Sequence, residues 1–158
     1  MALTKVRTGG FTAGSVLQVV STTKDDVFTH DQTTEVDITN LTASITPFST
    51  SSKVLVTVHI GSHGRDGNGD LVFRIKRGST AIGQGASGTF TATMASRSVG
   101  ELSDACSMMF LDSPSSASST AYKVTVQQSG SGNLKVNGRQ PDASFGTISS
   151  ITLMEIAG

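Results

Sequence analysis

Gly83-Gln-Gly85-Ala-Ser-Gly88 has the G-x-G-x-x-G spacing that cradles a dinucleotide pyrophosphate. That chemistry requires the glycines to open a helix whose N-terminus faces the phosphates. The residues that follow, Thr89-Phe-Thr-Ala-Thr93, are typical of a strand instead. We therefore interpret this segment as a flexible loop, and we expect no nucleotide cofactor.

Asp66-Gly-Asn68-Gly-Asp70 matches the start of a calcium-binding loop, in which alternating oxygen ligands surround a hard cation. The sixth position of such a loop is normally glycine and the twelfth a bidentate glutamate, but here they are Leu71 and Arg77. The segment is better explained as an Asx/Gly turn, and we expect no metal there.

The remaining reactive side chains form no recognisable catalytic set. A metal site needs three or four well-placed ligands, and His59 and His63 are four residues apart, a spacing that aligns on a helix but not on a strand leading into a loop. We therefore expect His30, His59 and His63 to face solvent or an interface. Ser21-Thr-Thr-Lys24 has the S-x-x-K spacing without the helix that this motif needs. Cys106 lies in an apolar run and is interpreted as a small buried thiol. We predict that the protein is not an enzyme.

The composition of the chain limits the classes of partner that the protein can have. The chain has 158 residues, enough for one domain with a single core, and its 12 basic and 12 acidic residues give a formal net charge of zero. Without a basic stripe a nucleic-acid partner is not expected. No apolar segment has the length of a secretory signal or a membrane span, so we expect a soluble product of the cytoplasm that does not contact membranes.

The elements that must position these residues are strands. In Lys53-Val-Leu-Val-Thr-Val-His-Ile-Gly61, valine and isoleucine recur at every second position, which predicts a half-buried strand. Gly/Ser/Asn/Asp segments separate further candidates, and the spacing predicts an antiparallel β-sandwich or jelly roll of the all-β class. We expect an N-terminal arm over residues 1–14 and one domain over 15–158. The other predicted strands cover 15–20, 26–30, 35–47, 70–76, 80–83, a short stretch near Phe90, 105–112, 120–128, 133–137 and 148–156.

Two predicted strands are apolar on both faces. Met109 and Leu111 lie opposite Cys106, Met108 and Phe110, and Met154 and Ile156 lie opposite Ile151 and Leu153. A strand of this kind is covered on both sides, either by the long 84–104 excursion or by another subunit. The candidate subunit interface is therefore Met109, Leu111, Met154 and Ile156, and we expect a cyclic homo-oligomer, with a trimer favoured.

Several phrases, taken in order, resemble a family of tailed-phage virion proteins that is abundant in marine viruses and is described as tail-fibre or virion structural proteins. The phrases are Gly14-Ser-Val-Leu-Gln-Val-Val20, Ser44-Ile-Thr-Pro47, Ser51-Ser-Lys-Val-Leu-Val56, Arg77-Gly-Ser-Thr-Ala-Ile-Gly83, Ser107-Met-Met-Phe-Leu-Asp-Ser-Pro114, Tyr122-Lys-Val-Thr-Val126 and Thr152-Leu-Met-Glu-Ile-Ala-Gly158. The resemblance implies an all-β module on a virus particle, often oligomeric, and brings no catalytic residues with it.

The chain departs from a complete tail fibre, because only its N-terminal arm is available to attach it to a particle. This favours a compact, non-enzymatic virion protein on the particle exterior, such as a capsid decoration or knob. A tail-fibre or receptor-binding module for a host surface is the alternative. The expected partners are other capsid or tail proteins. The candidate anchor is Leu3, Lys5, Val6 and Arg7, and the candidate exposed recognition loop is His63, Arg65, Asp66 and Asn68.

Overall fold

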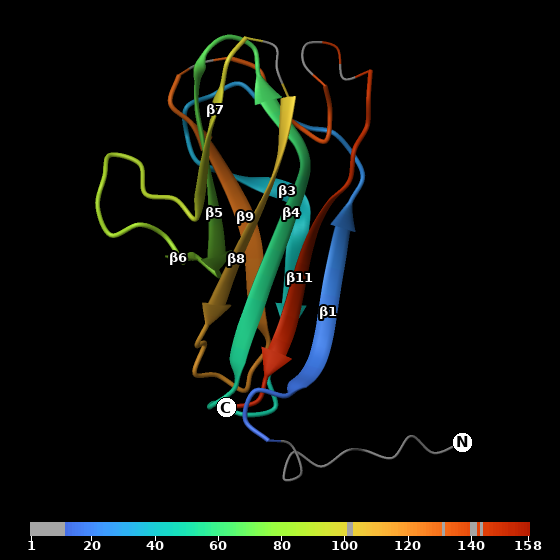
Figure 1. Cartoon of the computed structure of the whole chain (residues 1–158), viewed down its shortest axis with the longest axis vertical. Helices are drawn as coiled ribbons and strands as arrows, with labels where there is room; N and C mark the ends of the chain where they lie inside the picture. The colour runs from blue at the N-terminus through green and yellow to red at the C-terminus, as the bar shows by residue number, and fades with distance from the viewer. Residues whose placement is uncertain (1–11, 101–102, 131, 140–141, 143) are drawn as a thin grey trace.

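Two antiparallel β-sheets pack face to face in the computed structural model of the chain (Figure 1). The structure describes residues 12–100, 103–130, 132–139, 142 and 144–158, and this part of the chain contains strands and no helix. An antiparallel sandwich of the all-β class is thus confirmed. The strands are β1 (Val16–Lys24), β2 (Phe28–His30), β3 (Val36–Ile45), β4 (Lys53–Arg65), β5 (Gly69–Arg77), β6 (Thr80–Ile82), β7 (Met94–Ser98), β8 (Ser103–Asp112), β9 (Thr120–Gln128), β10 (Leu134–Val136) and β11 (Ser149–Ile156).

The first sheet, which we call sheet A, has six strands in the order β1-β11-β4-β10-β2, with β8 paired to the other edge of β4. The second, sheet B, has five strands in the order β3-β9-β5-β6, with β7 also paired to β5. Among the described residues there is no helix long and apolar enough to cross a membrane.

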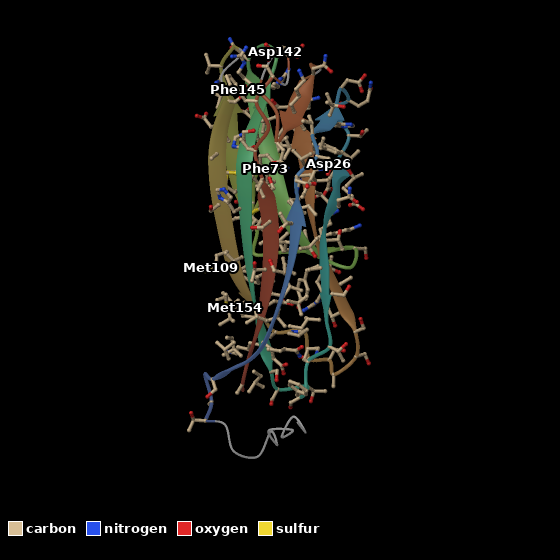
Figure 2. All side chains as sticks on the ribbon, turned by 90° about the vertical axis from the view of Figure 1, so that its right-hand side faces the viewer. Asp26, Phe73, Met109, Asp142, Phe145 and Met154 are labelled. Atoms are coloured by element: carbon tan, nitrogen blue, oxygen red, sulfur yellow. The ribbon has the colours of Figure 1, made fainter. Side chains whose placement is uncertain are left out.

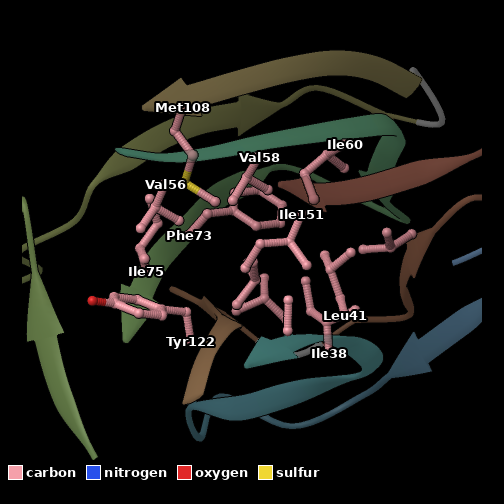
Figure 3. Close-up of a cluster of buried hydrophobic side chains, with 14 of the residues drawn as sticks. Ile38, Leu41, Val56, Val58, Ile60, Phe73, Ile75, Met108, Tyr122 and Ile151 are labelled. Atoms are coloured by element: carbon pink, nitrogen blue, oxygen red, sulfur yellow. The ribbon is translucent and has the colours of Figure 1, made fainter. Parts of the chain in front are cut away.

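The core lies between the sheets and is made by side chains that alternate inward along each strand (Figure 3). In β4, Val54, Val56, Val58 and Ile60 are fully buried, as their period of two requires. The inward side chains of β5 and β9, which include Phe73 and Tyr122, meet them from sheet B. The alternation that the sequence predicts for residues 53–61 therefore identifies the inward side chains of β4 correctly.

The two ends of the sandwich differ. At one end, which we call the basal end, the first described residues meet the C-terminus: the amide of Gly14 donates to the carbonyl of Ala157 at 2.8 Å. β4 begins near this end and runs to the opposite, distal end, where it turns into β5 (Figure 1). The predicted anchor residues Leu3, Lys5, Val6 and Arg7 lie outside the described residues.

Three sequence-based predictions of local structure are wrong. Residues 62–65 are not loop, because β4 continues to Arg65 and pairs there with β10. The short strand expected near Phe90 lies later, at β7. The Ser/Gly composition of Ser129-Gly-Ser-Gly132 predicts a hairpin turn between two neighbouring strands, but the strands before and after it, β9 and β10, belong to sheet B and sheet A.

Candidate assembly interface

The outer face of sheet A brings together side chains that are far apart in the sequence. In the registers of β1, β11, β4 and β8, Val19 lies opposite Met154, Met154 opposite Leu55, and Leu55 opposite Leu111. These residues form one row across four strands, and neighbouring side chains in such a row are about 5 Å apart. Met109 lies two residues from Leu111 in β8 and therefore points to the same face.

This row is exposed on the basal half of the molecule. The side chains of Met109, Val19 and Leu111 are 65%, 56% and 45% exposed, and those of Leu55 and Met154 are half-buried. Met109 and Met154 point away from the core on the same side of the sandwich (Figure 2). We call this surface the apolar band and define it as Val16, Val19, Leu55, Met109, Leu111, Met154 and Ile156.

All four residues of the predicted subunit interface, Met109, Leu111, Met154 and Ile156, lie in the apolar band. Val16, Val19 and Leu55 of the band were missed, although the sequence carried a signal for Val19 and Leu55. Each is an apolar residue between or beside inward-facing apolar neighbours, which makes the strand apolar on both faces.

The outer face of sheet A carries few charges over β1, β11, β4 and β8, and the half-buried Lys135, between the core residues Leu134 and Val136, adds one on β10. Beyond the apolar band, the outward positions that the registers join are mainly Ser and Thr, together with His59 and one charged residue, Lys53, at the basal margin. The Nδ1 atom of His59 lies 3.1 Å from the Oγ atom of Ser107 on the same face. A face of methyl and hydroxyl groups loses little polar hydration when another surface covers it.

The outer face of sheet B has the opposite character. The Glu35 carboxylate contacts the ammonium group of Lys76 at 2.7 Å and the Arg74 guanidinium at 3.7 Å, and Lys123 contacts Asp37 at 2.7 Å. Burial alone would raise the pKa of Glu35, but the hydrogen bonds from Lys76 and Thr125 and the nearby Lys76 and Arg74 charges lower it below its ordinary value. Such a network is typical of a face that stays in water.

The described part of the 84–104 excursion does not cover the apolar band. It packs on sheet B, where the carbonyl of Thr91 accepts a 2.7 Å hydrogen bond from Arg74 Nε and the Oγ1 atom of Thr93 accepts one from the amide of Ile75 at 3.0 Å. The Arg74 side chain, which this segment covers, is buried. Of the two covers considered for Met109 and Leu111, the excursion is therefore excluded within the described chain.

The predicted recognition loop is only partly exposed. His63 and Arg65 belong to β4 and are 2% and 3% exposed, so the prediction of their exposure is wrong. The His63 ring packs against Phe73, with 5.1 Å between ring centroids. Burial lowers the pKa of His63, against the opposing effect of the Asp104 charge, so the ring is neutral at pH 7.

The other two residues of that loop take part in bonds between turns. The Asp66 carboxylate accepts a short hydrogen bond from the amide of Asn133, and the Asp66 amide donates to the Asn133 carbonyl at 3.1 Å. The Oδ1 atom of Asn68 accepts a 3.0 Å hydrogen bond from the amide of Gly100. These side chains therefore join distal turns that are far apart in the sequence.

The residues considered for chemistry do not come together. No group of three His, Cys, Asp or Glu side chains suited to a metal occurs in the described ranges, and His30, His59 and His63 lie in different environments. The Cys106 thiol is half-buried, and burial raises its pKa to about 12, so it is not a thiolate at neutral pH. Residues 83–88 form an irregular loop, as expected, and the irregular structure continues through residues 89–93, where a short strand was predicted.

A second exposed apolar site lies at the distal end and was not predicted. Phe145 and Ile148 are 62% and 57% exposed. The Arg139 guanidinium lies 4.9 Å from the centre of the Phe145 ring and is held by Asp142 at 2.7 Å (Figure 2). The hydrogen bonds from Ser144 and Arg139 keep the pKa of Asp142 far below its ordinary value, so this ion pair persists at neutral pH.

Comparisons with known proteins give a distant likeness of fold. No protein-family model matches the chain, and no curated protein matches it. Among solved structures, that of infectious bursal disease virus Gx strain is 12% identical with a TM-score of 0.46, covering 89% of this chain and 37% of that chain. The VP2 subviral particle of the same virus is 13% identical, with a TM-score of 0.45 and coverages of 89% and 38%. The Gt strain is 16% identical, with a TM-score of 0.44 and coverages of 92% and 39%. The chain thus spans less than two fifths of the length of each, and similarity at this level does not define a function.

Proposed function

We propose that this protein is a non-enzymatic structural component of a virus particle, of the kind found on tailed phages, displayed on the particle exterior as a decoration or knob. The observation that carries the proposal is the difference between the two outer faces of the sandwich. One face has an exposed apolar band beside Ser and Thr, and the other has a network of ion pairs. The order of phrases shared with tailed-phage virion proteins supports the same function.

The physical argument is one of solvation. Exposed apolar area is stabilised by about 25 cal/mol for each Å² removed from water, whereas surface ion pairs gain little from being covered. The sandwich is therefore built to be covered on sheet A and solvated on sheet B. A rigid module with one such face suits assembly into a larger particle.

The test is to locate the chain in purified particles of the virus that encodes it. Particles are banded on a density gradient, and the chain is quantified by mass spectrometry against the major shell protein. Hundreds of copies per particle are expected for a shell decoration, whereas a few dozen or fewer would indicate a tail position. Recovery of the chain only in the soluble fraction of infected cells would contradict the proposal.

The alternative function is attachment to a host surface, and the distal site favours it. Phe145, which contacts the Arg139 guanidinium, presents an exposed aromatic ring at the end opposite the C-terminus. The loops first expected to recognise a host are less suitable, since His63 and Arg65 are buried. If the distal site attaches to a host, particles carrying Phe145→Ser should assemble normally and adsorb at least ten-fold more slowly. Unchanged adsorption would exclude this role for Phe145.

A further inference from the structure

We propose that the apolar band is covered by the same band of a second copy of this chain, which makes the pair a two-fold dimer in place of the trimer expected from the sequence. The inference rests on the proposed function, because it names the partner for the face through which the structural component assembles. The band is already grouped on one face by the strand registers, so no rearrangement is needed to present it.

Charge is the first argument for a second copy. A surface that meets itself places like groups near like groups, which is unfavourable for a face of one sign. The outward positions joined by the registers of β1, β11, β4 and β8 carry only Lys53, at the basal margin, and no acidic side chain. Two copies can therefore meet band to band while both Lys53 ammonium groups remain at the rim in water.

Shape and area are the second argument. Packed β-sheets lie about 10 Å apart with interdigitated side chains, and an unobstructed sheet face satisfies this geometry. Four strands at about 4.8 Å spacing and about eight residues at 3.3 Å each give a face of roughly 500 Å² per copy. A pair would bury about 1,000 Å², which is at the small end of specific interfaces. The association is thus expected to be reversible, with a Kd on the order of micromolar.

The direct test follows the wild-type protein on dilution. Light scattering coupled to size exclusion should show the mass of a pair near about 500 μM and a mass that falls toward that of the monomer below about 1 μM, as a Kd on the order of micromolar requires. With methyl-labelled methionine, the signals of Met109 and Met154 should shift over the same range. The signal of Met108, which points inward and is 6% exposed, is the internal control and should stay constant. A monomer at every concentration, or a mass change without shifts at Met109 and Met154, would overturn the inference.

A matched pair of variants tests the same contact by adding one negative charge inside the apolar band and one outside it. Met109→Asp should raise the Kd at least ten-fold, because it places a carboxylate within the covered band. Ala121→Asp adds the same charge at an exposed position of β9, in sheet B, and should leave the Kd unchanged. Equal effects of the two substitutions would overturn the inference. Thermal unfolding of both variants verifies folding, and the wild-type dilution experiment is independent of either.

The outcome is separable from the proposed function. A chain that is monomeric at all concentrations but present in purified particles would refute self-association and leave the virion function standing. A chain that self-associates through Met109 but is absent from particles would refute the virion function and leave self-association standing.

Discussion

The hydroxyl group of Tyr122 donates a 2.7 Å hydrogen bond to the carboxylate of Asp112 and so connects the two sheets inside the sandwich. Asp112 ends β8 in sheet A, and Tyr122 lies in β9 of sheet B. The same carboxylate accepts two hydrogen bonds from Arg77 Nη1, at 3.0 and 2.8 Å. Burial and the Asp112 charge raise the pKa of Tyr122, so its hydroxyl remains a donor throughout the neutral range.

We expect Tyr122→Phe to lower the free energy of unfolding by about 1.5 kcal/mol, since a buried hydrogen bond to a charged group is lost while the ring remains. Urea unfolding at pH 7 measures the change. Asp37→Asn is the control. It removes a carboxylate that pairs with Lys123 and is far more exposed than Asp112, so it should change stability by less than about 0.5 kcal/mol. Equal losses in the two variants would show that the bond between the sheets has no special role.

We expect His63 to make the fold sensitive to mild acid. Its pKa is lowered in the folded state, so below pH of about 6.5 the unfolded chain binds a proton that the folded chain excludes. Stability should therefore fall as the pH decreases through this window, by at most about 1.4 kcal/mol per pH unit. The pKa values of Asp26, Glu35 and Asp142 are also lowered, but these carboxylates affect stability at a lower pH than the range in which His63 does.

The measurement is the slope of unfolding free energy between pH 7 and pH 5. His63→Leu should flatten the slope whatever it does to absolute stability, and His59→Leu, at an exposed position, should leave it unchanged. The same slope in wild type and His63→Leu would show that other groups cause the pH dependence.

A third prediction concerns Gly61 in β4, whose backbone lies against the backbone of Ile148. A Cβ atom at Gly61 would lie 2.9 Å from the carbonyl carbon and 3.0 Å from the amide nitrogen of Ile148. Because these are backbone atoms, Gly61→Ala should cost about 2 kcal/mol or more through displaced strands. Gly146→Ala, where a Cβ atom would meet no atom within 4 Å, should change the thermal midpoint very little. A similar small effect at Gly61 would mean that the two segments separate easily.

A fourth prediction addresses attachment to the particle. Deletion of residues 2–10 should leave the thermal midpoint unchanged, because the described body retains the hydrogen bonds of Gly14 and Ser15 with Ala157. The shortened chain should no longer bind particles, as the anchor hypothesis for Leu3, Lys5, Val6 and Arg7 requires. Co-sedimentation of full-length and shortened chains with stripped particles measures this, and equal recovery of the two would refute the hypothesis.

Most strands follow from the sequence because their side chains alternate. β9 lies at the predicted residues, and β8 and β11 differ from the prediction only at their first residues. The apolar outer positions of β8 and β11 were also readable, since Met109 and Met154 interrupt the alternation expected of a wet face.

The rest depends on contacts that no local pattern encodes. Ser62-His-Gly-Arg65 has the composition of a loop, yet pairing with β10 extends β4 through it and buries His63 and Arg65. Likewise, the composition of Ser129-Gly-Ser-Gly132 is typical of a hairpin turn, but the same residue types also occur where the chain crosses from one sheet to the other. Only the tertiary arrangement distinguishes these cases.

The meeting of Gly14 with Ala157 gives the molecule a direction that can be used in engineering. A peptide fused at the C-terminus would emerge beside Ile156 of the apolar band and compete with whatever covers the band. A peptide grafted between Arg139 and Phe145 would instead project from the opposite pole. For displaying foreign epitopes on a particle, the internal loop is therefore the better insertion point, and the termini are better used for tethering.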